Sequence, residues 1–328
     1  MRPDISVIVP VYNTEKYIEK CARSLFSQTF DSIEYCFIDD CSDDNSISLV
    51  QNVLKEFPNR RAACKFIRNE TNRGVASSRN AGLAIAEGKY IYFCDSDDYI
   101  DETMLEKMFL KAKSSLADVV LCDFYFSYSD AKEYYSAIKW SEDKVASLKS
   151  YMVSPWTVLW NMLVRRDIYE KNKIGFIDGC GFCEDFNVAV KVLFVADKVV
   201  NIDEALYYYN QLNPMSAIKS YNEKSFRDEQ CVYLDVIDWL KSRNAYSDFS
   251  QELCWRILKI LQLLVLKSRY AEFLSFYPEV RFYIWSCPYL NVKLKIMMWS
   301  LFHHLGFVAR FMIALRNIRL SVVEFIKK

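Results

Sequence analysis

The chain has little glycine, little histidine and no net charge. Seven of its 328 residues are glycine and two are histidine, whereas glycine makes up about 7% of an average protein. The 42 basic and 42 acidic residues cancel, so the overall charge indicates no partnership with nucleic acid. No uninterrupted apolar run reaches the length of about 18 residues that a membrane-spanning helix needs. What remains is a globular composition, long enough for one large domain or two ordinary ones.

The eleven cysteines are scattered, without the regular spacing of a disulfide framework. Near the N-terminus, no charged start leads into an apolar segment of about 7–15 residues, so the sequence does not predict a signal peptide. Both observations favour a reducing, cytoplasmic environment. Cys180 and Cys183 have the spacing of a redox or zinc motif, but the only histidines are far along the chain, and we interpret the pair as a coincidence.

The few glycines are clustered. Six of the seven occur in two short stretches, at Gly74, Gly82, Gly88 and at Gly175, Gly179, Gly181. A chain that otherwise avoids glycine is expected to need unusual backbone angles or close approach at those places.

Residues 1–125 alternate short apolar runs with segments of helical period. The apolar runs are Ile5–Val9, Tyr35–Ile38, Lys65–Ile67, Tyr90–Cys94 and Asp118–Phe124. This alternation predicts an α/β fold with a mostly parallel sheet and helices on both faces. Residues 126–150 are expected to be a loop or excursion, and residues 220–328 to be mainly helical.

Two acidic clusters follow predicted strands. Asp39 and Asp40 come after the second strand, and Asp95-Ser96-Asp97-Asp98 comes after the fourth. Ligands of such sheets bind beyond the carboxyl ends of the strands. Carboxylates there can hydrogen-bond a nucleobase or ribose, and Asp95 with Asp97 can hold Mg²⁺ or Mn²⁺ together with substrate phosphates. The alternatives are a turn with a helix cap for the first cluster and a solvated loop for the second.

Two further segments combine charge with small residues. Arg79 lies within Asn72–Gly82, where it could meet a phosphate or base, unless the segment only packs tightly against the sheet. Glu184-Asp185 follow Gly181 and precede a predicted helix at Val188–Phe194. Asp185 could take the proton from an acceptor hydroxyl, unless the pair is an ordinary acidic helix start.

Taken in order, these segments resemble glycosyltransferase family 2. The resemblance is carried by Ser6 to Asn13, by Asp39-Asp40 with Ser42, Asp44 and Ser46, by Arg73-Gly74 through Arg79-Asn80-Ala81-Gly82, and by Asp95 to Asp98. It is strong over residues 4–125, weaker over residues 150–216 and absent beyond about residue 220. It implies the GT-A fold, which is Rossmann-like, and an inverting, metal-dependent transfer of a sugar, a hexose or N-acetylhexosamine, from a nucleotide sugar to a hydroxyl group.

The resemblance also implies roles for single residues. Pro10 and Tyr12 would lie near the base and ribose, Asp39 or Asp40 would hold the base, which is usually uracil, and Arg79 would contact the nucleotide. Asp95 would lie near the ribose and metal, and Asp97 would bind the metal, Mn²⁺ or Mg²⁺. Asp185 would be the catalytic base, with Glu184 and Trp160 on the acceptor side.

The sequence departs from the family pattern at several positions. Cys41 stands where glycine is usual, Met162 where lysine is common, and Asn210 where arginine often occurs. No Gln-x-x-Arg-Trp is present, so we expect single-sugar addition rather than processive synthesis. Two alternative functions stay open. A sugar-1-phosphate nucleotidyltransferase would be expected to have a glycine-rich loop after the first strand, and a non-catalytic GT-A-fold assembly protein would have no need of Asp95, Asp97 and Asp185.

The last segment, 291–328, is basic and apolar. Residues 280–328 hold eight basic residues against one acid, a net charge of +7. His303, Arg310, Asn317 and Glu324 recur every seven residues, which predicts one polar helix stripe beside a wide apolar face. Such a segment is typical of peripheral contact with an anionic membrane. The alternatives are a helix packed on the catalytic core and a dimer contact.

The cysteine pattern and the C-terminal segment predict a cytoplasmic enzyme at the inner face of the cell membrane. The family resemblance alone implies that it acts in bacterial surface-polysaccharide or glycolipid biosynthesis. Its GT-A catalytic domain would span residues 1–220, with 1–125 binding the nucleotide sugar and 126–220 forming the acceptor side. Residues 221–328 would form the helical C-terminal region. The acceptor would be a glycan or lipid-linked glycan, and the sequence leaves homo-oligomerisation open.

Overall fold

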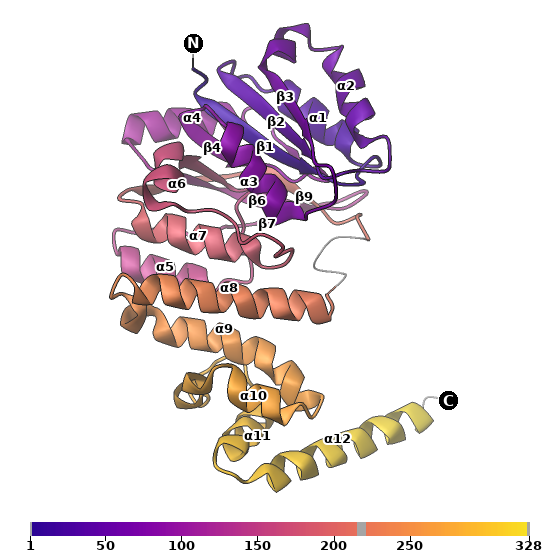
Figure 1. The fold of residues 1–328 in the computed structure, drawn as a ribbon, viewed down its shortest axis with the longest axis vertical. Helices are drawn as coiled ribbons and strands as arrows, with labels where there is room; N and C mark the ends of the chain where they lie inside the picture. The colour runs from indigo at the N-terminus through magenta and orange to yellow at the C-terminus, as the bar shows by residue number, and fades with distance from the viewer. Residues whose placement is uncertain (1, 215–220, 327–328) are drawn as a thin grey trace. The chain divides into compact units, whose positions relative to one another are not determined.

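The computed structural model describes residues 2–214 and 221–326, and side chains as far as residue 316 (Figure 1). The chain forms two compact units, Met1–Val236 and Ile237–Lys328. The first holds the sheet with its flanking helices, and the second is helical.

One mixed sheet forms the centre of the first unit. Its strand order is β3-β2-β1-β4-β8-β6-β9-β5, and β7 pairs with β6. The strands are β1 (Ile5–Val11), β2 (Ile33–Asp39), β3 (Cys64–Arg68), β4 (Tyr90–Phe93), β5 (Tyr99–Ile100), β6 (Val119–Ser127), β7 (Lys132–Tyr135), β8 (Met162–Arg165) and β9 (Val199–Asn210).

Six of these strands run in the same direction. β1 is parallel to β2 and β4, β2 is parallel to β3, and β6 is parallel to β9. β8 is antiparallel to both of its neighbours, β4 and β6, so it joins the two parallel groups without reversing their direction. The α/β class with a mostly parallel sheet is therefore confirmed, and so are the five predicted strands, with bounds that differ by one to three residues.

Helices cover both faces of this sheet (Figure 1). The helices of the first unit are α1 (Ile18–Phe26), α2 (Ser46–Leu54), α3 (Val75–Ile85), α4 (Met104–Ser115), α5 (Lys144–Val153), α6 (Arg166–Asn172) and α7 (Glu184–Val195). A 3-10 helix spans Pro58–Ala63. α8 (Glu223–Lys241) crosses the boundary between the units. Residues 126–150 are not one loop, because they contain the end of β6, all of β7 and the start of α5.

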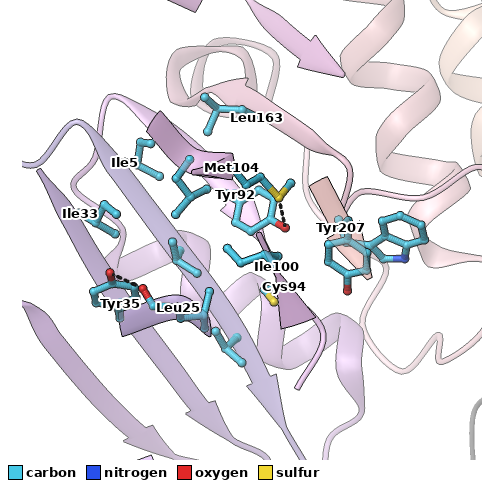
Figure 2. Close-up of a cluster of buried hydrophobic side chains, with 14 of the residues drawn as sticks. Ile5, Leu25, Ile33, Tyr35, Tyr92, Cys94, Ile100, Met104, Leu163 and Tyr207 are labelled. Atoms are coloured by element: carbon cyan, nitrogen blue, oxygen red, sulfur yellow. Dashed lines mark hydrogen bonds between the residues drawn. The ribbon is translucent and has the colours of Figure 1, made fainter. Parts of the chain in front are cut away.

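The core is built from alternate side chains of the strands. Val7 and Val9 of β1 pack with apolar residues of α1 and α4 on one face, and Ile8 points to the opposite face towards α3. Figure 2 shows part of this cluster, where the hydroxyl of Tyr35 donates to the carbonyl oxygen of Leu25 at 2.8 Å. Burying a phenol ring with its hydroxyl paired avoids the cost of an unsatisfied polar group.

The second unit consists of helices, as predicted. They are α9 (Tyr246–Leu266), α10 (Tyr270–Phe276), a 3-10 helix at Pro278–Tyr283, α11 (Val292–Phe302) and α12 (Gly306–Ile326). None of the helices described here is long and apolar enough to cross a membrane.

The single polar stripe predicted for the C-terminal segment is wrong. α11 ends at Phe302, one residue before His303, and α12 begins only at Gly306, so His303 and Arg310 do not share a continuous helix. His304, with a φ of 60°, makes the left-handed turn between them. A seven-residue spacing keeps residues on one face only within a continuous helix. The side chains of Asn317 and Glu324 lie outside the described ones.

Candidate active site

The two acidic clusters lie at the same edge of the sheet. β2 ends at Asp39 and β4 ends two residues before Asp95, and both strands are parallel to β1, which lies between them. Their carboxyl ends therefore flank the end of β1 and the loop that carries Tyr12. This is the edge where ligands of such sheets bind.

Asp39 and Asp40 hold the loops at this edge. Asp39 accepts from Arg68 Nη1 at 2.5 Å and from the backbone N–H of Ser42 at 2.9 Å. Asp40 accepts from the backbone N–H groups of Arg73 at 2.9 Å and Gly74 at 2.7 Å. Both carboxylates are 3% exposed. They thus perform the turn-forming role directly, and their contact with a base stays a prediction.

The turn after this pair keeps the shape that glycine would provide. Cys41 replaces the usual glycine and has a φ of 63°, in the left-handed region. Such a conformation costs a non-glycine residue about 1 kcal/mol or more. The departure at Cys41 therefore leaves the turn in place rather than changing its course.

Pro10 and Tyr12 differ in exposure. Pro10 is buried within β1, where its register partner is Ile38. Tyr12 follows the strand, and 46% of it is exposed. The next residue, Asn13, has a φ of 50° and donates its backbone N–H to Ser42 Oγ at 3.2 Å. The β1–α1 loop is thereby fixed to the β2–α2 loop, with the Tyr12 ring free to meet a ligand.

Asp98 is buried inside the turn after β4 and holds it by hydrogen bonds. It is 1% exposed and accepts from the Tyr207 hydroxyl and, at 2.7 Å, from the backbone N–H of Asn210. Burial raises the pKa of Asp98 well above its usual range, and the charges of Asp97 and Asp95 add to the shift. Asp98 therefore fastens the turn to β9 and is not available to a ligand.

Asp97 and Asp95 are the carboxylates that this turn presents. Asp97 Oδ2 accepts from Asn213 Nδ2 at 2.8 Å, and the Asp97 carbonyl oxygen accepts from Asn210 Nδ2 at 3.0 Å. Burial and the charge of Asp95 raise the pKa of Asp97. Within residues 2–214 and 221–316, no lysine or arginine pairs with Asp97, so a bound cation would relieve this repulsion.

The carboxylate oxygens of Asp95 and Asp97 are suitable ligands for a divalent cation. Mg²⁺ and Mn²⁺ take hard oxygen ligands, commonly one or two carboxylates together with substrate phosphates. Asp95 and Asp97 supply two such carboxylates. Over the described part of the chain, no cluster of three or more His, Cys, Asp or Glu side chains is arranged to hold a metal ion. Cys180 and Cys183 form no such cluster either.

Arg79 connects this turn to the Glu184-Asp185 pair. α3 can lie this close to β1 because residue 82 is a glycine. A Cβ at that position would come within 2.3 Å of Ile8. Arg79 lies on α3, and its Nη2 donates to Asp95 at 2.8 Å. Its Nη1 donates to Glu184 and to Asp185, each at 2.7 Å. The arginine side chain is 3% exposed. The structure thus brings four of the predicted site residues into one ion cluster.

Asp185 has the properties expected of a base near neutral pH. It lies in the first turn of α7, and its side chain is 16% exposed. Burial raises the pKa of Asp185 to about 7, although Arg79 opposes this shift and Glu184 and Asp95 add to it. Its second oxygen accepts from the backbone N–H of Leu159 at 3.3 Å. A base is most effective when its pKa is close to the working pH.

Trp160 is buried rather than exposed at the surface of the first unit. It is 3% exposed and stacks on Tyr207 with ring centroids 4.2 Å apart, and Tyr207 is the partner of Asp98. Its neighbour Leu159 supplies the N–H group to Asp185. Trp160 therefore supports two parts of the site at once, and a direct contact with an acceptor stays a prediction.

Sequence reasoning missed the partners that come from β9 and the residues after it. Tyr207, Asn210 and Asn213 contact Asp97 or Asp98 from more than 100 positions away in the chain. The one signal in the sequence is the position of Asn210 directly after three tyrosines, where the family pattern often has arginine.

Comparison with known proteins gives a consistent result. The family model "Glycosyl transferase family 2" matches residues 6–184, more than half of the chain. Two relatives from Bacillus subtilis are the uncharacterized glycosyltransferase EpsJ, 33% identical over 66% of this chain, and the putative glycosyltransferase EpsH, 30% identical over 76% of it. The matches span 63% of EpsJ and 73% of EpsH.

A solved structure has the same fold. Residues 1–349 of Staphylococcus aureus TarS, in complex with UDP-GlcNAc, superpose with a TM-score of 0.70 and 22% sequence identity. The superposition covers 97% of this chain and 92% of that one. At this identity the likeness establishes the fold, including the helical C-terminal region.

Proposed function

Because the chain belongs to glycosyltransferase family 2 and is a glycosyltransferase, we propose that it transfers a sugar from a nucleotide sugar to a hydroxyl group of a glycan or lipid-linked glycan. The donor is of the UDP type, as in the complex of its structural neighbour TarS. Family membership favours this activity over nucleotidyl transfer and over a purely structural role.

The observation that carries the proposal is the ion cluster around Arg79. Asp185 and Asp95 accept from the same guanidinium group, and Asp95 is the first of the two carboxylates that would hold a cation for the donor diphosphate. A base on one side and a diphosphate site on the other suit a single in-line displacement, which inverts the anomeric carbon. Asp185 takes the proton of the attacking hydroxyl in this arrangement.

The donor would bind at the carboxyl edge of β1, β2 and β4. Tyr12 offers an exposed ring there, and Pro10, Asp39 and Asp40 shape the wall behind it. Asp95 and Asp97 would hold Mn²⁺ or Mg²⁺, which neutralises charge on the leaving diphosphate when bound. Residues 1–125 would thus serve the donor and residues 126–220 the acceptor, with Glu184 beside the base and Trp160 beneath.

Turnover is expected to rise with pH through neutrality. Burial raises the pKa of Asp185 to about 7, and only its ionised form can accept a proton. The ionised fraction, and with it kcat/KM, should increase about tenfold between pH 6 and pH 8. The measurement is UDP release from a UDP-sugar over this range. A flat profile would contradict the assignment of Asp185 as the base.

We further propose that the second unit contacts an anionic membrane through residues 291–328. Phe307, Phe311 and Leu315 follow one another at four-residue spacing on α12 and are 63%, 63% and 51% exposed. Trp299 on α11 is 36% exposed. The segment's basic excess is complementary to anionic lipid head groups, and exposed aromatic side chains bury well at the interface.

A double substitution, Phe307→Ser with Phe311→Ser, is expected to weaken vesicle binding at least about tenfold, because each lost phenyl ring removes about 1.5–3 kcal/mol of apolar burial. Co-sedimentation with phosphatidylcholine vesicles containing phosphatidylserine measures the effect. Leu116→Ser is the matched control, since Leu116 is 81% exposed in the first unit. Equal binding by the double variant, or equal binding to vesicles without phosphatidylserine, would remove this proposal.

The proposed function is tested by transfer of labelled sugar. Purified enzyme with Mn²⁺, a panel of labelled UDP-sugars and a lipid or polysaccharide extract from a bacterium should give a labelled glycan. Label that remains entirely in the donor or its hydrolysis product, with every UDP-sugar, would argue against the acceptor class.

A further inference from the structure

Arg79 holds three carboxylates that come from two distant parts of the chain. Asp95 follows β4, whereas Glu184 and Asp185 begin α7, about 90 residues later. The three donor–acceptor distances are 2.7, 2.7 and 2.8 Å. Bidentate and branched contacts of this kind are a property of the planar guanidinium group, which offers several donors in a fixed fork.

The guanidinium group is enclosed as well as paired. Its carbon lies 5.9 Å from the centroid of the Phe93 ring and 5.5 Å from that of Phe176. These rings come from β4 and from the loop before α7. Together with the ion pairs they leave 3% of the side chain exposed. A nucleotide could therefore reach Arg79 only if the side chains around it moved.

The charges around Asp185 make Arg79 indispensable to it. The groups that face this carboxylate are Arg79 from α3, Glu184 from its own helix, Asp95 after β4 and the backbone N–H of Leu159. Burial raises the pKa of the Tyr169 hydroxyl, on α6, and the nearby charge of Asp185 adds to the shift. Arg79 is the one cation in this set, and together with the weaker contribution of the Leu159 N–H it opposes the burial and repulsion that disfavour an ionised Asp185.

We propose that Arg79 is a positioning residue for the transfer reaction: it holds Asp185 ionised and aimed, and links it to Asp95 on the donor side, rather than binding the nucleotide. The inference rests on the proposed function, since it assigns Asp185 as the base. One guanidinium group thereby links the ion pairing of Asp95, on the donor side, to the ion pairing of Asp185, the base. A cation or donor that binds at Asp95 would change the hydrogen bond and the charge pairing between Arg79 and Asp185.

The test compares Arg79→Gln and Arg79→Lys with the wild-type enzyme. The readouts are UDP release from UDP-N-acetylglucosamine and other UDP-sugars across pH 5.5–9, and UDP affinity by isothermal titration. In Arg79→Gln, the rising limb of the kcat/KM profile should move to higher pH by about one pH unit or more, because an opposing charge has been removed. Turnover should fall about a hundredfold, as expected of a misplaced base, with UDP affinity within about threefold of wild type.

Arg79→Lys separates charge from geometry. A lysine retains the positive charge, so the rising limb should return towards its wild-type position. One ammonium group lacks the fork that reaches three carboxylates, so turnover should remain about tenfold below wild type. Arg165→Gln is the matched control, because Arg165 also bridges two carboxylates, Asp118 at 2.7 Å and Asp167 at 2.6 Å, but on β8 away from the site. Its pH profile should equal that of the wild type.

The outcomes distinguish the inference from the proposed function. A wild-type enzyme that turns over no donor would contradict the proposed function itself. An active wild type whose Arg79→Gln variant loses UDP affinity more than tenfold, with an unmoved pH limb, would overturn only the positioning role and make Arg79 a nucleotide contact. If Arg79→Gln does not fold, the Arg79→Lys variant is the test. Wild-type turnover in Arg79→Lys would show that the branched guanidinium contacts are not needed and would equally overturn the positioning role.

Discussion

Replacing Asp185 by asparagine is expected to abolish sugar transfer and leave UDP binding nearly intact. The asparagine side chain has the same shape but cannot accept the proton of the attacking hydroxyl. Loss of a general base typically costs about 10²–10⁴-fold in rate. UDP affinity should hardly change, because the donor would bind beside Asp95 and Asp97. Arg79 separates Asp95 from Asp185. The rate of UDP-sugar turnover and the titration of UDP measure the two effects.

The same substitution has an expected effect on stability. The pKa of Asp185 is about 7 in the folded chain against an ordinary value of 3.8. A carboxyl group with a raised pKa binds its proton more tightly in the folded state, so its contribution to stability is present at low pH and is lost as the pH rises from about 4 to about 7. At pH 8, Asp185→Asn should therefore unfold at the wild-type temperature or above it. A clearly lower unfolding temperature would show that the ionised form is stabilising and that the pKa is not raised.

A matched control keeps this prediction specific. Asp167→Asn removes a carboxylate that also lies in the first turn of a helix, α6, and pairs with Arg165 and Lys171 outside the site. Its turnover should stay within about twofold of wild type. Retained turnover in Asp185→Asn, or equal loss in Asp167→Asn, would remove Asp185 from its catalytic role.

The second large effect is expected at Asp97. Asp97→Ala should remove the stimulation of UDP-sugar turnover by Mn²⁺, with a loss of at least about a hundredfold, since even the outer partners of metal ligands contribute about 10–100-fold. The structural reason is that Asp97 is held towards the site by Asn213 and lies within two residues of Asp95, with no cationic partner among the described side chains. UDP release as a function of Mn²⁺ concentration gives the measurement.

Asp130→Ala is the control for this experiment, because Asp130 is an exposed aspartate in the β6–β7 turn. It should show the wild-type dependence on Mn²⁺. An Asp97→Ala enzyme that responds normally to Mn²⁺ would mean that the ion, if required, is held elsewhere.

The parallel part of the fold could be predicted because its signals are local. Buried parallel strands are short apolar runs, and the helices between them show their own period, so β1 to β4 and β6 are visible in 125 consecutive residues. β8 and β7 have no such signal. Met162–Arg165 is apolar but only four residues long, too short to show a pattern of its own. The strand Lys132–Tyr135 is polar and mostly exposed, so its composition does not differ from that of a loop.

The site could be predicted in its parts but not in its assembly. Asp39, Asp95 and Asp185 stand out because each occurs beside a strand end or helix start in a recognisable order. What joins them depends on packing between distant segments, which no spacing encodes. Arg79 is the clearest case, since its position in a helix of small residues indicates close packing but not that three carboxylates surround it.

The most direct test of the central claim is isothermal titration of the purified wild-type protein with UDP, with and without Mn²⁺. The account predicts that UDP binds and that Mn²⁺ tightens the binding, because Asp95 and Asp97 alone repel the diphosphate and a shared cation would reverse that repulsion. A folded protein that binds neither UDP nor, in the same experiment, GDP or dTDP would contradict the account, since the carboxyl edge of β1, β2 and β4 would then not be a nucleotide-sugar site.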